Sequence, residues 1–450
     1  MFQKILIANR GEIAVRIIRA CRELGIKSVA VYSTADRDAL HTQLADEAIC
    51  IGGPAPKDSY LNMERILSAA NACHADAIHP GFGFLSENAK FAQMCHKCNI
   101  KFIGPSADVI DRMGNKQEAR KTMMAAGVPV VPGSKEAVYT AMEGKKIADE
   151  MGYPVMIKAS SGGGGKGMRI SRSAEDFEGN FKVAQQESIN GFGDNTMYIE
   201  KYIESPRHIE IQILADQHGN VVSLGERDCS IQRRHQKLIE ECPSAALDEK
   251  LREKMGAVAV KAAKAAGYES AGTIEFLLDK NKKFYFMEMN TRIQVEHPVT
   301  EMVTGLDLIK EQIHIAQGEK LTFKQKDIVL RGHSIECRIN AENPEKNFMP
   351  NPGKIEYLHF PGGNGIRVDS AIYSGYTIPP YYDSMIAKII VYAKDREAAI
   401  DKMRSALGEI NIDGVVTNLD YQYEIINHSV FQSGDFNTHF IQEFFENVQK

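Results

Sequence analysis

Short apolar runs alternate with amphipathic stretches through the first hundred residues. Between Ile13 and Leu24 the apolar side chains recur at helical spacing, and Gly25 follows as a helix stop. A second helix is expected from about Ser86. The remaining apolar runs predict strands at Lys4–Ala8, Ser28–Tyr32, Ala77–His79 and Lys101–Ile103. Strands that alternate with helices predict an α/β domain built on a parallel sheet.

The pattern changes beyond a helix that leads to Gly114, where the turn-rich segment Gly127–Ser134 begins a different region. Strand-like segments now follow one another with few helices between them. These strands are predicted at Pro154–Ala159, Met168–Arg172, Met197–Tyr202, Ile209–Ala215, Val221–Leu224, Thr273–Leu278 and Phe284–Asn290. One long helix, rich in Ala, Lys and Glu, is predicted at Leu247–Ala266.

A third region begins after Leu330. It contains several turns rich in glycine and proline, and closing helices are predicted near Arg396–Leu407 and Asn437–Val448. A chain of 450 residues exceeds what one hydrophobic core usually organises, so two or three domains are expected.

The charge and cysteine content exclude several classes of protein. A net charge of −5 gives no general affinity for nucleic acid or acidic membranes, so neither is expected as a partner. The apolar run at the amino terminus reaches Asn9 and Arg10 at once, too early for a secretory signal. The eight cysteines are scattered, which favours reduced thiols in a cytoplasmic enzyme. Cys95 and Cys98 have no second pair at zinc spacing, so helix packing is the better interpretation.

A glycine run, Ser160–Met168, is the first candidate for chemistry. Four consecutive glycines carry no Cβ atom, so backbone N–H groups can approach a polyphosphate closely. The run is not a P-loop, because Lys166 is followed by Gly167 and the flanking segments are strands. A flexible surface turn is the alternative. The nearby Lys158 and Lys166 favour a lid that closes over phosphates.

The segment Phe284–His297 and the strand before it combine apolar and acidic positions. Alternation along an extended chain places Glu288, Asn290 and the polar residues through Glu296 on one face. Glu275 lies on the preceding strand. Two carboxylates and an amide form a site of hard oxygen atoms, which suits Mg²⁺. A solvated sheet face is the alternative, but the flanking Phe, Met and Ile residues argue against it.

Two further segments are rich in polar groups. The stretch Glu226–Lys237 gathers five cations, which predict a site for a small anion unless they form a surface charge run. The cations are Arg227, Arg233, Arg234, His235 and Lys237. In Glu200–Glu210, a strand end could hold an adenine amino group, and His208 could reach phosphate or ribose. The evidence from Glu200–Glu210 is weak by itself, since a single histidine is more often structural.

Taken together, these segments resemble one known family. YPVMIKASSGGGGKGM and FYFMEMNTRIQVEHPVTEM are similar to the two signature blocks of biotin carboxylase, an ATP-grasp enzyme. RGEIAVRIIRA, AIHPGFGFLSEN, ERDCSIQRRHQK and PPYYDSMIAK also resemble that family. The resemblance covers essentially the whole chain, and the blocks occur in the family's order.

The resemblance implies a fold of mixed α/β (α+β) class with a three-domain ATP-grasp architecture. An amino-terminal α/β domain is expected at 1–113, an ATP-grasp domain with a glycine-rich lid (about 131–204) at 114–330, and a carboxy-terminal domain at 331–450. It also implies the reaction. ATP and bicarbonate give carboxyphosphate and ADP, and the carboxyl group then moves to N1′ of biotin on a separate carrier protein.

Roles for individual residues are implied by the same resemblance. The expected ATP-binding residues are Lys116, Lys158, Gly164, Gly165, Glu200, Lys201, Tyr202, Ile203, His208, His235, Glu275, Leu277 and Glu288. Glu275, Glu288 and Asn290 match ligands of two Mg²⁺ or Mn²⁺ ions. The expected bicarbonate-binding residues are Lys237, Arg292, Gln294 and Val295. Glu296 matches the base that deprotonates bicarbonate, and Arg338 the biotin-binding residue that stabilises its enolate.

Three positions depart from the family's pattern, namely Phe82, Cys242 and Asn364. Asn364 replaces an aromatic residue at the family's dimer contact, whereas Arg19, Glu23 and Arg367 match it. A homodimer is therefore expected, with a weaker interface.

The sequence contains no AMKM-type biotinyl-lysine motif, so the carrier and the carboxyltransferase are expected on separate chains. A chain of this length resembles the biotin carboxylase subunit of bacterial acetyl-CoA carboxylase, which feeds malonyl-CoA and fatty acid synthesis. The alternatives are the equivalent subunit of a split pyruvate or other acyl-CoA carboxylase, or another ATP-grasp ligase. The RIQVEH run and the long carboxy-terminal region disfavour the last. A regulator without activity is disfavoured because every expected metal and bicarbonate position is kept.

Overall fold

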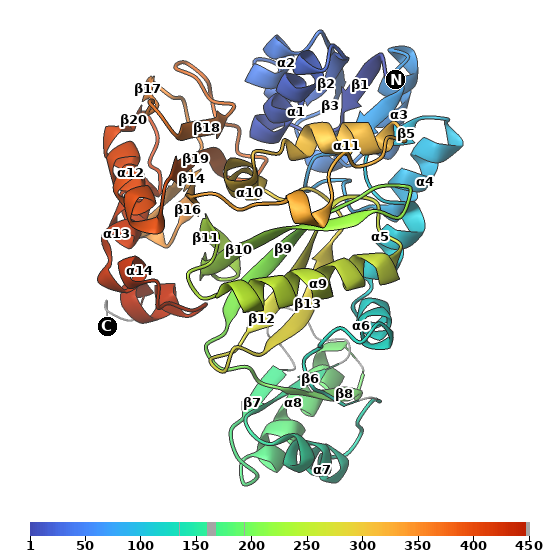
Figure 1. Ribbon diagram of the computed structural model, residues 1–450, viewed down its shortest axis with the longest axis vertical. Helices are drawn as coiled ribbons and strands as arrows, with labels where there is room; N and C mark the ends of the chain where they lie inside the picture. The colour runs from blue at the N-terminus through green and yellow to red at the C-terminus, as the bar shows by residue number, and fades with distance from the viewer. Residues whose placement is uncertain (135, 160–167, 193, 447–450) are drawn as a thin grey trace. The chain divides into compact units, whose positions relative to one another are not determined.

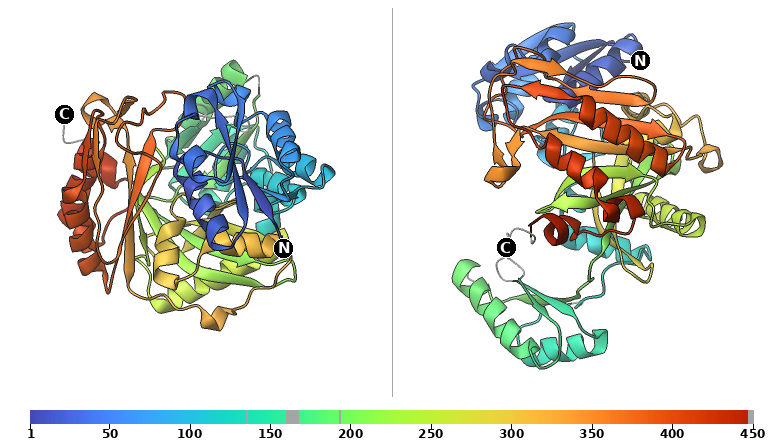
Figure 2. Two further views of the ribbon diagram at one scale, coloured as in Figure 1. Left: turned by 90° about the horizontal axis from the view of Figure 1, so that it is seen from above. Right: turned by 90° about the vertical axis from the view of Figure 1, so that its left-hand side faces the viewer.

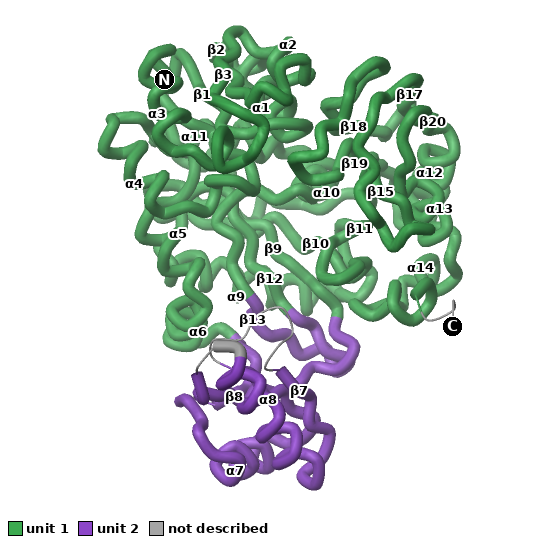
Figure 3. The backbone as a smooth tube through the Cα atoms, turned by 180° about the vertical axis from the view of Figure 1, so that it is seen from behind, with its two compact units in different colours: residues 1–128, 207–276, 288–450 green, residues 129–206, 277–287 purple. Residues whose placement is uncertain are grey.

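The protein is represented by a computed structural model that describes residues 1–134, 136–159, 168–192 and 194–446. The chain forms two compact units, which Figure 3 distinguishes by colour. Unit 1 comprises 1–128, 207–276 and 288–450, and unit 2 comprises 129–206 and 277–287. The mixed α/β class expected from the sequence is confirmed, since one sheet is parallel and the larger one is built from antiparallel pairs.

The amino-terminal part of unit 1 is the predicted parallel sheet (Figure 1). Its strand order is β3-β2-β1-β4-β5, with bounds Glu47–Gly52, Lys27–Ser33, Lys4–Ile7, Ala77–His79 and Lys101–Phe102. Ile5 and Ile7 pack with helix α1 (Gly11–Glu23). Leu6 belongs to a different core, with α3 (Met63–Ala72) and α4 (Ala89–Lys97). Side chains that alternate along the strand thus bury both faces of the sheet.

The rest of unit 1 is organised by an eight-stranded sheet. Its order is β13-β12-β9-β10-β11-β14-β19-β18. The bounds, in that order, are Phe284–Asn290, Ser270–Leu278, Arg207–Ala215, Val221–Arg233, Gln236–Cys242, His333–Asn340, Met385–Ala393 and Ile366–Ser370. β11 and β14 pair antiparallel, with Glu240 opposite Glu336. Because this pairing joins the central and carboxy-terminal segments, their strands share one backbone ladder.

Several helices of unit 1 contact this sheet. α9 (Glu249–Ala266) contacts β9 and β10, α10 (His297–Thr304) contacts β10 and β14, and α12 (Arg396–Glu409) contacts β14 and β19. The other helices of unit 1 are α2 (Leu40–Leu44), α5 (Ala107–Gly114), α6 (Lys116–Ala125), α11 (Leu308–Ala316), α13 (Leu419–Asn427) and α14 (Ser429–Ser433). Its short strands are β15 (Glu342–Asn343), β16 (Met349–Pro350), β17 (Tyr357–His359) and β20 (Asn411–Asp413). In the part of the chain that is described, no helix has the length and apolar character needed to cross a membrane.

Unit 2 is a small antiparallel sheet covered by two helices (Figure 2). The strand order is β7-β6-β8, with bounds Met168–Ser171, Val155–Ala159 and Met197–Lys201. Helices α7 (Ala141–Met151) and α8 (Phe177–Phe192) cover one face. Val155 and Ile157 of β6 point into the same core as Phe177 and Phe181 of α8. The period of two along the strand therefore sets which face is buried.

Three predicted elements differ most from the structure in their limits. β10 continues to Arg233 rather than ending at Leu224, because its polar residues are buried and paired. The extended segment predicted through Glu296 ends at Asn290, and α10 begins at His297. A π-helix at Gln442–Glu446 replaces most of the predicted closing helix, whose Val448 lies outside the described residues.

Gly332, just before β14, carries the most severe backbone restriction near the large sheet. Its φ is +66°, and a Cβ would lie 2.3 Å from the carbonyl oxygen of Ala393. Gly332→Ala is expected to lower the free energy of unfolding by roughly 3 kcal/mol, from strain and overlap together. Gly267→Ala is the matched control, since Gly267 has φ +64° with no atom within 4 Å of the added Cβ. It should cost only about 1–2 kcal/mol. Equal losses in urea titrations of the two variants would contradict the overlap.

Candidate active site

Buried charges gather where β9, β10, β11 and β12 run side by side. Lys237 of β11 is at the centre of this cluster, with its Nζ atom 2.6 Å from Glu210, 2.6 Å from Glu296 and 3.1 Å from Glu275. Burial by itself would lower the pKa of Lys237, but Cys229 and the three carboxylates raise it well above its ordinary value. Lys237 is therefore a charged donor surrounded by acceptors.

Glu275 of β12 is held by several donors. Its Oε1 atom accepts hydrogen bonds from Asn290 (2.8 Å) and Gln294 (2.9 Å), and His208 Nε2 lies 3.0 Å from Oε2. Burial acts to raise the pKa of Glu275, but Lys237 and His208 outweigh it and hold the pKa below its ordinary value. The carboxylate is therefore ionised at neutral pH.

Glu288 of β13 differs from Glu275, because its pKa is raised rather than lowered. Burial, and then the charge of Glu275, raise the pKa of Glu288. A divalent cation between the two carboxylates would offset this repulsion, and the oxygen donors suit Mg²⁺ or Mn²⁺. Asn290 is less available, because its Oδ1 atom accepts from Arg292 (3.0 Å). His208 and Glu210 also fit a metal, since their ligand atoms lie within 4.8 Å of each other and of Glu275.

The loop 291–296 connects β13 to α10. Arg292 donates its Nε hydrogen to Glu87 at 2.9 Å, so its guanidinium is held by a carboxylate from the amino-terminal part of unit 1. The backbone carbonyl of Val295 accepts a hydrogen bond from Lys388 Nζ at 2.8 Å. Lys388 has a fully buried side chain and lies 3.1 Å from Glu12. Residues far away in the sequence thus fix the backbone of this loop.

Glu296 lies directly before α10, between two cations. Lys237 approaches one of its oxygens, and Arg338 Nη2 lies 2.9 Å from the other. Burial favours a higher pKa for Glu296, but Lys237, Arg338 and Arg227 together keep the pKa well below its ordinary value. Arg338 of β14 also donates its Nε hydrogen to Glu240 at 2.6 Å. A carboxylate base and an arginine therefore lie in direct contact.

The residues expected in unit 2 are placed as follows. Lys158 of β6 forms an ion pair with Glu200 of β8, which lies diagonally across from it, since Glu200 pairs with Met156. Lys201 Nζ donates to the carbonyls of Gly152 (3.0 Å) and Tyr153 (2.9 Å). Three other residues of this unit are half-buried, namely Tyr202, Ile203 and Leu277. Gly164 and Gly165 lie outside the described residues.

Two residues with an expected nucleotide role lie at element ends of unit 1. Lys116 begins α6 and is exposed. His235 is exposed in the turn between β10 and β11, where its φ is +66°. Among the described residues, no hydrogen bond connects Lys116 or His235 to the charge cluster.

The five cations predicted to share one anion site are divided among different partners. Arg227 is fully buried, and all its partners are protein groups. Arg233 bonds to Glu446 (2.9 Å), and both Arg233 and Arg234 bond to Asn347. Only Arg227 and Lys237 lie in the charge cluster, so the prediction of a single five-cation site is wrong. Their positions along the hairpin explain the division, because Arg227 lies inside β10 whereas Arg233 ends that strand and Arg234 and His235 lie in the turn before β11.

Sequence reasoning missed Glu210, Glu240, Glu87 and Lys388. One signal was present, because β9 carries polar residues at every second position of an apolar strand. His208, Glu210 and Gln212 are all buried. Buried polar residues with a period of two indicate one polar face inside a core, and this pattern could have identified Glu210.

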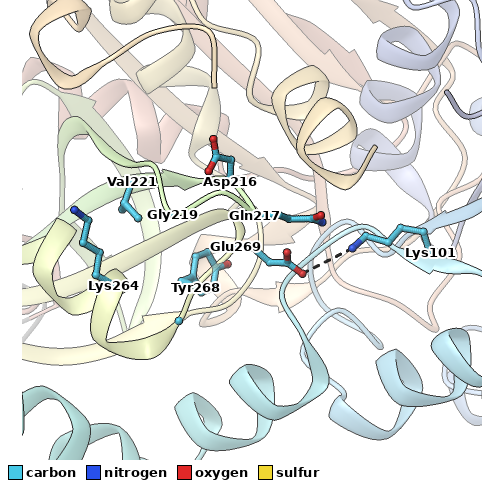
Figure 4. Close-up of a pocket in the computed structure, with 9 residues that line it drawn as sticks. Lys101, Asp216, Gln217, Gly219, Val221, Lys264, Tyr268 and Glu269 are labelled. Carbon is cyan, nitrogen blue, oxygen red and sulfur yellow. Dashed lines mark ion pairs between the residues drawn. The ribbon is translucent and has the colours of Figure 1, made fainter. Parts of the chain in front are cut away.

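A separate pocket of about 480 Å³ lies in unit 1 and shares no residue with the charge cluster (Figure 4). Lys101 and Glu269 line it and lie 3.8 Å apart. Asp216, which also lines it, accepts hydrogen bonds from the backbone of His218, Asn220 and Leu321. Both acidic side chains of the pocket therefore have partners within the protein.

Comparisons with known proteins indicate the family to which this chain is similar. Three family models match: "Biotin carboxylase, N-terminal domain" at 1–110, "Carbamoyl-phosphate synthase L chain, ATP binding domain" at 115–324, and "Biotin carboxylase C-terminal domain" at 336–443. The chain is 61% identical over 445 residues to biotin carboxylase 1 of Bacillus subtilis, which covers 99% of both chains. It is 57% identical over 444 residues to a pyruvate carboxylase subunit of Methanothermobacter thermautotrophicus, covering 99% of this chain and 90% of that one.

Solved structures give the same result. The biotin carboxylase domain of a thermophilic 2-oxoglutarate carboxylase, bound to bicarbonate, has a TM-score of 0.95 at 52% identity and 98% coverage of both chains. Biotin carboxylase from Campylobacter jejuni, in a complex with a form of ATP, has a TM-score of 0.90 at 51% identity. That match covers 98% of this chain and 99% of the other.

Glu336 provides a test of burial in this region. Within the described part of the chain, neither of its carboxylate oxygens has a hydrogen-bond partner, and burial raises its pKa well above the ordinary value of 4.5. The folded state therefore keeps a proton that the unfolded chain releases. Its contribution to stability is complete below pH 4.5 and is lost as the pH rises toward the folded pKa.

Glu336→Gln should remove this loss. Between pH 6 and pH 8, we expect wild type to lose about 1 kcal/mol or more of its free energy of unfolding through ionisation of Glu336. The variant should not show this loss. Urea titrations at the two pH values measure this difference. The same pH dependence in both proteins would show that Glu336 is ionised in the folded state.

Proposed function

The chain belongs to the biotin carboxylase family, and from this premise we propose that its charge cluster carries out the ATP-dependent carboxylation of biotin by bicarbonate. The observation that carries the proposal is the contact of Glu296 with both Lys237 and Arg338. On the proposed roles, Glu296 is the base, Lys237 the anion-binding cation and Arg338 the enolate-stabilising cation, and their contact supports this assignment. Three chemical tasks of the reaction are then assigned to adjacent groups.

In the first step, Glu296 accepts the proton of bicarbonate. An oxygen of the resulting carbonate attacks the γ-phosphorus of ATP, which gives carboxyphosphate and releases ADP. Glu296 is a weak base while Lys237 and Arg338 stabilise its charge. Bicarbonate that binds Lys237 competes for that cation and so raises the basicity of Glu296. Arg292, Gln294 and Val295 are assigned to the same anion, with Arg292 supplying a planar fork of donors.

In the second step, the C–O bond of carboxyphosphate breaks to give CO₂ and inorganic phosphate. The phosphate takes the proton of biotin N1′, and N1′ then bonds to the carbon of CO₂. Negative charge develops on the ureido oxygen, and Arg338 is assigned to stabilise it. Glu240 and Glu296 hold the guanidinium of Arg338 in place before biotin arrives. Such preorganised charge avoids a rearrangement during the reaction.

The oxygen donors of Glu275, Glu288 and Asn290 are assigned to divalent metal ions. The raised pKa of Glu288, caused by burial and by Glu275, indicates a carboxylate whose charged form a bound cation would stabilise. When bound, Mg²⁺ or Mn²⁺ neutralises charge on the phosphates of ATP.

Nucleotide contacts are proposed separately for each unit. Within unit 1 they are Lys116, His208, His235, Glu275 and Glu288. Within unit 2 they are Lys158, Gly164, Gly165, Glu200, Lys201, Tyr202, Ile203 and Leu277. The ion pair of Lys158 with Glu200 supports the second group, because it keeps a cation and a carboxylate together at neighbouring positions of β6 and β8.

We further propose the division into domains at 1–113, 114–330 and 331–450, with the lid at about 131–204, which the limits of the three matching family models support. The proposed partners are a biotin carboxyl carrier protein, carboxyltransferase subunits and a second copy of this chain. A relative's structure is described as a dimer, which supports the last. Eight free thiols fit a reducing compartment such as the cytoplasm.

The acceptor of the carboxyl group is proposed to be acetyl-CoA, by way of the carrier. Matches of similar strength to stand-alone biotin carboxylases and to a pyruvate carboxylase subunit keep pyruvate as the second candidate. Purified complex incubated with acetyl-CoA or with pyruvate, ATP and labelled bicarbonate distinguishes the two by the labelled product.

Bicarbonate-dependent ATP hydrolysis that free biotin stimulates is the direct test of the reaction. Lys237→Ala should lower this activity by about a hundredfold or more, since the central cation of the anion pocket is lost. Lys264→Ala is the control, because Lys264 is an exposed lysine of the separate pocket. Near-normal carboxylation by Lys237→Ala would contradict the assignment, and a wild-type protein that biotin does not stimulate would favour another ATP-grasp ligase.

Arg338→Ala should separate the two steps. Carboxylation of biotin is expected to fall by about a hundredfold, while hydrolysis of ATP with bicarbonate but without biotin falls less than about tenfold. Assays of the two activities on one preparation give the ratio. An equal fall in both would remove the enolate role.

Glu288→Gln should raise the Mg²⁺ concentration for half-maximal activity by about tenfold, because a metal-ligand carboxylate is replaced by an amide. Glu311→Gln is the matched control, since burial also raises the pKa of Glu311 but this residue lies on α11. An unchanged Mg²⁺ titration for Glu288→Gln would contradict its role as a ligand.

A further inference from the structure

Arg227 of β10 has a fully buried side chain whose hydrogen-bonding capacity is completely used. A guanidinium has five N–H donors and no acceptor. Here Nε donates to Glu210 (2.6 Å), Nη1 to Gln212 (2.6 Å) and Thr300 (3.0 Å), and Nη2 to Thr273 (3.2 Å) and Gln294 (2.6 Å). Five contacts for five donors fix the guanidinium plane in one orientation.

The contact with Gln294 determines which way its amide points. Because the guanidinium can only donate, the atom that faces Arg227 must be the amide oxygen. The NH₂ group of Gln294 then faces the opposite side, where it donates to Glu275 at 2.9 Å. Arg227 therefore keeps the donor end of this amide on the side of Lys237 and the carboxylates. A bound anion needs donors there, and a flipped amide would present an oxygen.

The contact with Glu210 acts on the central lysine. One oxygen of Glu210 accepts from Arg227, and the other lies 2.6 Å from Lys237 Nζ. Glu210 is fully buried, so its charge requires compensation. Without Arg227, Lys237 would be the main counter-charge of Glu210 and would be drawn toward it.

We infer that Arg227 is the positioning residue of the proposed bicarbonate pocket, acting through the amide of Gln294 and the carboxylate of Glu210. The inference rests on the proposed function, because it assigns Gln294 and Lys237 to bicarbonate. Arg227 itself does not touch the anion. Lysine cannot replace it, since an ammonium group has three donors and no planar fork.

The test compares Arg227→Lys with wild type and with Arg252→Lys. Arg252 is the matched control because it holds Glu226, the neighbour of Arg227 along β10, through three contacts between 2.9 and 3.1 Å. KM for bicarbonate, KM for ATP and kcat are measured for biotin-stimulated ATP hydrolysis. For Arg227→Lys, KM for bicarbonate should rise by about tenfold or more, equivalent to about 1.4 kcal/mol, while KM for ATP stays within about twofold.

A second variant keeps the inference testable if Arg227→Lys does not fold. Thr273→Val removes one acceptor of Nη2, the nitrogen that also holds Gln294, and preserves the shape of the side chain. Its KM for bicarbonate should rise by about two- to fivefold, with KM for ATP unchanged. The rise in Tm that bicarbonate causes in the presence of MgADP should shrink in both variants.

The outcomes separate this inference from the proposed function. A wild-type protein without bicarbonate-dependent hydrolysis would overturn the function, whereas the variants test only the role of Arg227. Unchanged KM for bicarbonate in folded Arg227→Lys, or equal rises for bicarbonate and ATP, would overturn the inference. An equal rise in KM for bicarbonate in Arg252→Lys would show that weakening any arginine contact to a carboxylate of β10 has the same effect, and it would overturn the specific role of Arg227.

Discussion

The pairing of Arg227 and Lys237 with buried carboxylates is the interaction on which the rest of unit 1 depends. An isolated charge inside a protein is costly, and it persists only where partners of opposite sign surround it. Glu210, which contacts both cations, is fully buried, and so is the guanidinium of Arg227. These contacts cross three neighbouring strands, β9, β10 and β11. These contacts offset the free-energy cost of burying the charges, and they also position the donors of the candidate site. A substitution at these residues should therefore affect both stability and activity.

This cluster also depends on distant parts of the sequence meeting in one sheet. Arg338 comes from the carboxy-terminal segment, and it reaches Glu296 because β14 pairs with β11. Lys388 lies on β19, beside β14, and holds the carbonyl of Val295. Glu12, on the first helix, approaches the same lysine. The loop that carries Gln294 to Glu296 is therefore supported by the amino-terminal, central and carboxy-terminal segments together.

The sequence predicted some of this well and some of it poorly, for physical reasons. The parallel sheet followed from buried apolar runs, and the limits of β13 were predicted correctly because the buried Phe284 and Phe286 alternate with more exposed residues at its start. The predicted extended chain through Glu296 was wrong. Parity assumes a straight strand, whereas α10 begins at His297, directly before Pro298, which is favourable in a first helical turn. The role of Glu210 was missed because its partner Lys237 lies 27 positions further along. Local patterns cannot show which strands become neighbours.

The cations that we assign to the substrate already contact carboxylates of the protein. Arg292 is held by Glu87, and Lys237 by Glu210, Glu275 and Glu296. A monovalent anion such as bicarbonate therefore has to compete with groups of its own charge. A divalent cation on Glu275 would weaken that carboxylate's attraction for Lys237, and the contact of Arg227 with Glu210 already weakens another. On the proposed assignment, the metal and Arg227 thus have the same effect. Each reduces the attraction between a protein carboxylate and Lys237, which leaves more of the charge of Lys237 for the substrate.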